Sequence, residues 1–102
     1  MKLEQEIFLI ISCSGDARSH AMEAIQFAKD GDFTSANNSI ELANEKLSEA
    51  HKQQTKLIQA EADGNGVEAT LLLIHAQDHL MSTITVRDLA REFVELYERL
   101  EK

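Results

Sequence analysis

The sequence predicts an all-α fold, a bundle of three long helices in an antiparallel up-down-up arrangement. The 102 residues include no proline and only four glycines, so few positions interrupt a helix. Apolar residues recur at spacings of three and four, the period of an amphipathic helix. Two breaks, Gly31-Asp32 and Gly64-Asn65-Gly66, divide the chain into three segments. A chain of this length suits a single domain, residues 1–102.

Glycines and an acidic cap set the expected helix boundaries. The three expected helices span residues 2–30, 33–62 and 67–101. A glycine just after an apolar-periodic run suits the position past a helix C-terminus, where the backbone φ is positive. Gly31 and Gly64 both fit this rule, and Asp32 can then cap the second helix through its carboxylate.

Each of the first two helices carries one apolar stripe. In the second helix the stripe follows heptad spacing and has a single polar member, Gln54. Its other members are Phe33, Ala36, Ile40, Ala43, Leu47, Ala50 and Leu57. The stripe of the first helix consists of Leu3, Ile7, Ile10, Ser14, Ala17, Ala21, Ala24 and Ala28. Gly15 lies in the middle of that helix, where glycine costs about 1 kcal/mol relative to alanine, so either a close helix contact or a kink is expected there.

The third expected helix is apolar on nearly every face between Leu71 and Ile84. A helix that is apolar all round is normally buried all round. Three helices of this size cannot surround one of their own members. We therefore expect the chain to associate with copies of itself, with the third helix near the centre of the assembly.

Charge and cysteine content exclude several function classes. Ten basic against eighteen acidic residues give a formal net charge of −8 at pH 7, which argues against binding nucleic acid. A single cysteine excludes an internal disulfide and a cysteine-based zinc site, and it suits the reducing cytoplasm. The longest early apolar run, residues 7–11, is far shorter than the about 20 residues of a membrane-spanning helix. We expect a soluble cytoplasmic protein that does not insert into a membrane.

Four polar residues interrupt the apolar third helix at spacings that place them on one face: His75, Asp78, His79 and Ser82. On a buried face such groups cost about 1–3 kcal/mol each unless they are satisfied. Spacing alone leaves three interpretations open. The cluster could fix helix register through hydrogen bonds, bind a transition metal through two histidines and an aspartate, or contain a nucleophilic histidine that accepts a phosphoryl group.

Five short motifs, in a fixed order along the chain, carry a resemblance to a known family. The most specific is His-Ala-Gln-Asp-His-Leu-Met at residues 75–81. The others are Ser14-Gly15-x-Ala17-Arg18-Ser19, Gly31-Asp32-Phe33, Glu49-Ala50-His51 and Gln54-Thr55-Lys56-Leu57-Ile58. Over nearly its whole length the chain resembles enzyme IIA of the lactose/cellobiose/diacetylchitobiose class of the bacterial sugar phosphotransferase system.

The resemblance implies a phosphotransferase component that works as a homotrimer with a nine-helix core. The first histidine of the signature, His75, would carry the phosphoryl group on Nε2. The donor would be the histidine phosphocarrier HPr, and the acceptor would be the cysteine of the cognate enzyme IIB. The membrane permease, enzyme IIC, would then take up a disaccharide of the lactose, cellobiose or chitobiose type.

The resemblance also implies roles for three neighbours of His75. Asp78 matches the trimer-axis aspartate, where three carboxylates repel one another unless they are protonated or bridged. A structural Mg²⁺ or similar divalent cation suits such a ring, and no nucleotide is expected. His79 is expected to donate a hydrogen bond to the phosphoryl oxygens or to orient His75. Gln77 also matches the signature, but it points about 160° away from His79, toward a different neighbour.

Two rival interpretations stay open at this stage. One is a metal-binding helical bundle that uses His75, Asp78 and His79. The other is a non-catalytic helical adaptor or regulator that has kept the fold. The motifs also contain His51, for which a hydrogen-bonding role between helices is expected, and Arg18, which is expected to pair with a carboxylate.

Overall fold

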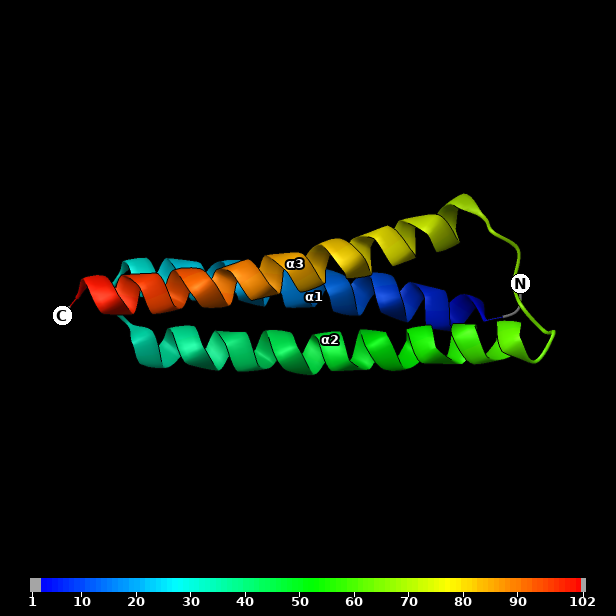
Figure 1. Ribbon diagram of the computed structural model, residues 1–102, viewed down its shortest axis with the longest axis horizontal. Coiled ribbons are helices and arrows are strands. Elements are labelled where there is room, and N and C mark those ends of the chain that lie inside the picture. The colour runs from blue at the N-terminus through cyan, green and yellow to red at the C-terminus, as the bar shows by residue number, and fades with distance from the viewer. Residues whose placement is uncertain (1–2, 102) are drawn as a thin grey trace.

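Three helices account for almost all of residues 3–101, the part of the chain that the computed structural model describes. They are α1 (Glu4–Lys29), α2 (Phe33–Ala62) and α3 (Leu71–Leu100). They run up, down and up along a rod of 55 × 20 × 16 Å, as the sequence predicts (Figure 1). Residue 2 of the first expected helix lies outside the described residues.

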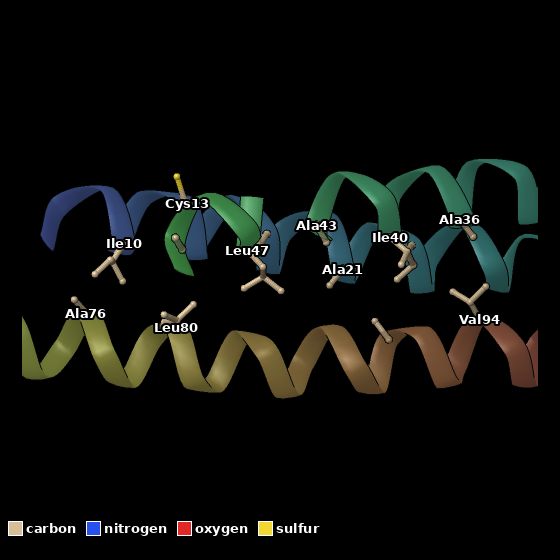
Figure 2. Packing of buried hydrophobic residues seen from close by; sticks show 14 of the residues in the cluster. Ile10, Cys13, Ala21, Ala36, Ile40, Ala43, Leu47, Ala76, Leu80 and Val94 are labelled. Carbon is tan, nitrogen blue, oxygen red and sulfur yellow. The ribbon is translucent and has the colours of Figure 1, made fainter. Parts of the chain in front are cut away.

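The helix α1 is the central element of the protomer. It packs extensively on both α2 and α3, whereas α2 and α3 contact each other least. Small residues make this close approach possible, because the buried face of α1 is alanine at Ala17, Ala21, Ala24 and Ala28. Larger side chains fill the remaining space between the three helices, among them Ile10, Leu47, Leu80 and Val94 (Figure 2). The apolar stripes predicted for the first two helices are therefore the core faces.

The helix ends predicted from glycines are confirmed at Ala62 for α2 and to within one residue for α1, which ends at Lys29 instead of residue 30. Gly31 and Gly64 have φ of 79° and 83°, the left-handed region that glycine adopts without a steric penalty. After α1, the Asp32 amide donates to the Phe27 carbonyl at 2.9 Å. After α2, the Asn65 amide donates to the Ala60 carbonyl at 2.8 Å. These bonds, of the Schellman type, satisfy carbonyl groups that the helix itself leaves unpaired.

The prediction that the third helix begins at residue 67 is wrong, because α3 begins at Leu71. Thr70 is extended, with φ −84° and ψ 164°, and its hydroxyl accepts a hydrogen bond from the Leu73 amide at 3.2 Å. A threonine that caps a helix in this way cannot also be part of its interior. Val67 instead packs its side chain against the core from the connecting segment. At the other end, the helix stops at Leu100, one residue earlier than predicted.

Among the described residues, none of the helices combines the length and the apolar character needed to cross a membrane.

The Asp32 cap is expected to stabilise the fold in a pH-dependent way. The Ser35 amide donates to Asp32 Oδ1 at 3.1 Å, and this backbone hydrogen bond holds the pKa of the Asp32 carboxyl below 3.8, its ordinary value. The stabilisation is therefore complete above pH 3.8 and is lost as the pH falls through the lower pKa of the folded state. The urea midpoints of the wild type and Asp32→Ala should differ near neutral pH, and the difference should shrink as the pH falls below 3.8.

Asp32→Asn is the matched control for this measurement. Asparagine caps a helix about as well as aspartate but does not titrate. The urea midpoint of Asp32→Asn should therefore exceed that of Asp32→Ala by the same amount at every pH. A wild-type advantage that is undiminished in acid would contradict the assignment.

Candidate functional site

The polar cluster predicted on the third helix is brought together at the surface of α3. His75, Asp78 and Ser82 are exposed, and His79 is half-buried. The imidazole rings of His75 and His79 are stacked, with their centroids 5.9 Å apart and their planes inclined by 14°. Within one protomer these residues do not lie on a buried stripe. Their polar groups are in contact with solvent and need no internal partners.

Most of the remainder of this exposed face is apolar. Large apolar side chains lie along α3 on the side opposite the core, at Leu71, Ile74, Met81, Leu89, Phe93, Leu96 and Leu100. We call these seven residues the α3 seam. Their exposed fractions range from 44% to 83%, and Asp78 lies among them. A long row of exposed, large apolar side chains on a small protein normally marks a protein–protein contact.

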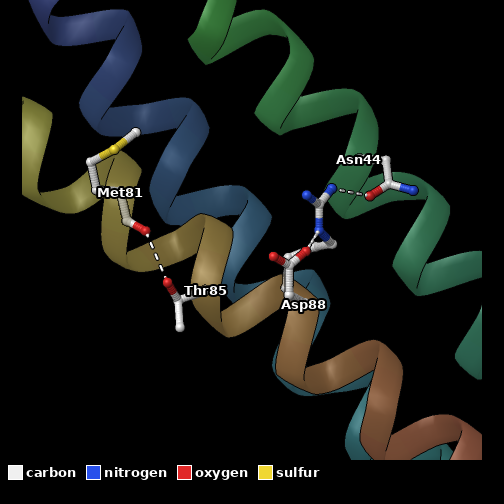
Figure 3. A network of polar contacts seen from close by, with 5 residues as sticks. Asn44, Met81, Thr85 and Asp88 are labelled. Carbon is white, nitrogen blue, oxygen red and sulfur yellow. Dashed lines mark hydrogen bonds and ion pairs between the residues drawn. The ribbon is translucent and has the colours of Figure 1, made fainter.

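One polar residue on the seam side satisfies its own hydroxyl. The Thr85 Oγ1 donates to the Met81 carbonyl at 3.4 Å, one helical turn back (Figure 3). The hydroxyl is thereby paired within α3, and a partner that covers this face would not leave it unsatisfied. The side of α3 that faces α2 carries polar side chains. Arg87 donates from Nη1 to Asn44 Oδ1 at 2.6 Å and from Nε to Asp88 Oδ1 at 2.8 Å.

Gln77 faces α2 and not His75. The Gln54 Nε2 donates to the Gln77 Oε1 at 3.0 Å in a part-buried contact. Sequence reasoning noticed Gln54 as the polar member of an apolar stripe but did not identify its partner. The signal was present, because a buried amide needs a hydrogen-bond partner and Gln77 points away from its signature neighbours. This bond joins α2 to α3, the two helices that contact each other least.

The remaining candidates do not form a second site. Cys13 is buried, and its burial raises the pKa of the thiol above the usual 9.0, so the thiol stays protonated at neutral pH. His51 and Arg18 are both exposed. Within residues 3–101, no group of three or more histidine, cysteine or acidic side chains could hold a metal ion. The rival interpretation of a metal site made by His75, Asp78 and His79 of one chain is therefore not favoured.

Comparisons with known proteins agree with the motifs. Residues 5–98 match the family model described as "PTS system, Lactose/Cellobiose specific IIA subunit". The lichenan-specific phosphotransferase enzyme IIA component of Bacillus subtilis (strain 168) is 54% identical over 99 residues, which cover 97% of this chain and 90% of that protein.

Solved structures show the same fold. The cellobiose-specific enzyme IIA of Bacillus anthracis superimposes with a TM-score of 0.95 at 53% identity, covering 99% of this chain and 93% of that one. The IIA(chitobiose) structure in complex with HPr, from the N,N'-diacetylchitobiose branch of the Escherichia coli phosphotransferase system, gives a TM-score of 0.86 at 40% identity. It covers 100% of this chain and 99% of that chain.

The fold, the motifs and these likenesses define a small helical phosphotransferase component. The chain belongs to the lactose/cellobiose-specific IIA subunit family of the sugar phosphotransferase system.

The bond between Gln54 and Gln77 is expected to stabilise the bundle. Gln54→Leu should lower the free energy of unfolding by about 1–3 kcal/mol, because the Gln77 Oε1 loses its donor in a part-buried position. The double variant Gln54→Leu/Gln77→Leu should recover most of that loss, since replacing both partners leaves nothing unsatisfied. Urea denaturation measures the free energy of unfolding of the wild type, the single variant and the double variant.

Gln59→Leu, at an exposed position of α2, controls for the substitution itself and should change stability by no more than about 0.5 kcal/mol. A double variant that is no more stable than Gln54→Leu would show that the amide pair is not the source of the loss.

Proposed function

We propose that this chain is a phosphohistidine carrier that accepts a phosphoryl group on His75 and passes it on for sugar uptake. The donor is an HPr-type phosphocarrier, and the acceptor is the cysteine of the cognate enzyme IIB, with the permease enzyme IIC downstream. The observation that carries this proposal is the exposure of His75 at the head of the signature in a chain of this family. A related IIA protein has been solved in complex with HPr, which supports the choice of donor.

The chemistry requires little of the protein besides an accessible ring. The lone pair of the neutral His75 imidazole, at Nε2, attacks the phosphorus atom of the donor phosphohistidine. A nitrogen–phosphorus bond forms on His75, and the one on the donor breaks, leaving its electron pair on the donor ring. In the second transfer the thiolate of enzyme IIB attacks phosphorus, and the His75 ring leaves. No separate base is needed in either step, and His75 returns unchanged.

His79 is the supporting residue with the best geometry. Its ring stacks on His75 at a centroid distance of 5.9 Å, so His79 is the neighbour that can orient the His75 ring. Gln77 contributes differently. Its hydrogen bond to Gln54 holds this part of α3 against α2, and so supports the orientation of the helix that carries His75.

We further propose a cytoplasmic homotrimer in which three copies of the α3 seam meet along the central axis. The seam is apolar and runs almost the full length of α3, and Asp78 lies within it. Three Asp78 carboxylates provide only oxygen ligands, which fit Mg²⁺ or a similar hard divalent cation better than zinc. Such an ion would be structural, neutralising the charge of the carboxylates. The sugar served is a disaccharide of the lactose, cellobiose or chitobiose type.

Replacing the proposed nucleophile should abolish phosphoryl uptake without changing the fold. With phosphoenolpyruvate, enzyme I and HPr, the wild type should gain the mass of one phosphoryl group that is labile in acid and stable in base. His75→Gln should gain none, while His20→Gln, a matched substitution on α1, should behave as the wild type. Intact-mass spectrometry is the measurement. Uptake by His75→Gln at the wild-type rate would assign the nucleophile to another residue.

Removing the Asp78 charge should leave the trimer intact or strengthen it. Asp78→Leu eliminates the repulsion between three carboxylates and adds apolar area to the seam. Sedimentation velocity in the presence of a chelator should therefore show less dissociation for Asp78→Leu than for the wild type. Glu98→Leu, at an exposed position on the opposite side of α3 from the seam residue Leu89, should match the wild type. A monomeric Asp78→Leu protein would mean that the carboxylate ring itself is required for assembly.

A further inference from the structure

The helix α1 lacks a side chain at the point where it passes His79. A Cβ atom built on Gly15 would lie 3.6 Å from the His79 Nε2. The α1 helix runs from Glu4 to Lys29 without a break, so Gly15 does not end or interrupt it. Of the two roles that the sequence allowed for Gly15, a close contact between helices is therefore the one that the structure supports.

Gly15 can affect His75 only through the ring of His79. His79 is half-buried, whereas His75 is exposed and projects from the surface of α3. The two rings are nearly parallel, inclined by 14° at a centroid distance of 5.9 Å. The His79 ring therefore lies near Gly15 of α1 and is also stacked on His75, so a shift of His79 would change the stacking with His75.

We propose that Gly15 is a positioning residue, which leaves the space that His79 needs to lie against α1 and to hold the His75 ring in its stacked orientation. This inference rests on the proposed function, in which His75 carries the phosphoryl group. Gly15 touches no reacting atom and acts only through His79.

The distance from Gly15 to His79 predicts a sharp dependence on side-chain size. A methyl group 3.6 Å from the ring makes an ordinary van der Waals contact, so Gly15→Ala fits. Valine extends a further carbon–carbon bond of about 1.5 Å from Cβ, and its stiff χ1 leaves it little freedom to turn away. The His79 ring must then leave its place, and the stack with His75 is lost.

Phosphoryl uptake from phosphorylated HPr, followed over time by intact mass, measures the consequence. Gly15→Ala should stay within about twofold of the wild-type rate, because its contact is not strained. Gly15→Val should be slower by about tenfold or more, the scale expected when a reacting group is misplaced. Gln26→Val, at an exposed position of α1, is the control for introducing valine into this helix. Gly15→Leu, which favours helix more than valine does, provides the same comparison if Gly15→Val does not fold.

A double-mutant cycle tests whether Gly15 acts through His79. In a His79→Ala background the ring is absent, so Gly15→Val should cause no further loss of rate. An equal loss in both backgrounds would show that Gly15 acts by another route and would overturn the inference.

The NMR signals of the unphosphorylated protein separate this inference from the proposed function. The ring-proton shifts of His75 should change in Gly15→Val in the same direction as in His79→Ala, and should stay near the wild-type values in Gly15→Ala. These shifts do not depend on phosphoryl transfer, so they respond even if the wild type takes up no phosphoryl group and the proposed function fails. Wild-type rates and wild-type His75 shifts in Gly15→Val would overturn the positioning role and leave the proposed function standing.

Discussion

The structure depends on a single helix that is apolar on two opposite sides. One side of α3 packs on α1 and α2 through fully buried residues such as Leu80 and Ala90. The other side, the α3 seam, remains exposed in the protomer, with Phe93 at 44% and Leu71 at 83%. Exposed apolar surface of this extent is unfavourable in water, and burying it contributes roughly 25 cal/mol per Å². The folded chain thus leaves a large apolar surface exposed, and the trimer that we propose would cover it.

The histidine pair lies at the boundary between these two sides. The half-buried His79 is close to the core side and to α1, and the exposed His75 is closer to the seam. This position has a functional consequence, because a residue on the seam itself would be buried by assembly and a residue on the core side would never reach a partner protein. The boundary is where an imidazole can be oriented by its own protomer and still meet a phosphoryl donor. A carrier that exchanges its group with two different proteins needs both properties.

Local patterns in the sequence predicted most of the fold, and the errors arose where local rules do not apply. The ends at Gly31 and Gly64 and the Asp32 cap follow from the requirements of a few neighbouring residues, and all were predicted. The start of α3 was misplaced because the helix was expected directly after the break that ends at Gly66, whereas the cap that starts it is Thr70. The bond between Gln54 and Gln77 depends on how α2 and α3 are aligned, which no local pattern encodes. The clustering of His75, Asp78 and His79 was predictable, since one helix carries all three, but the role of Gly15 required the packing of α1 on α3.

The central claim is that the α3 seam is buried by self-association, and the mass of the wild-type protein in solution tests it most directly. Sedimentation equilibrium over a wide range of protein concentrations, with a divalent cation present, should return the mass of three chains throughout. A mass of one chain at every concentration would contradict the account, because the seam would then remain exposed to water.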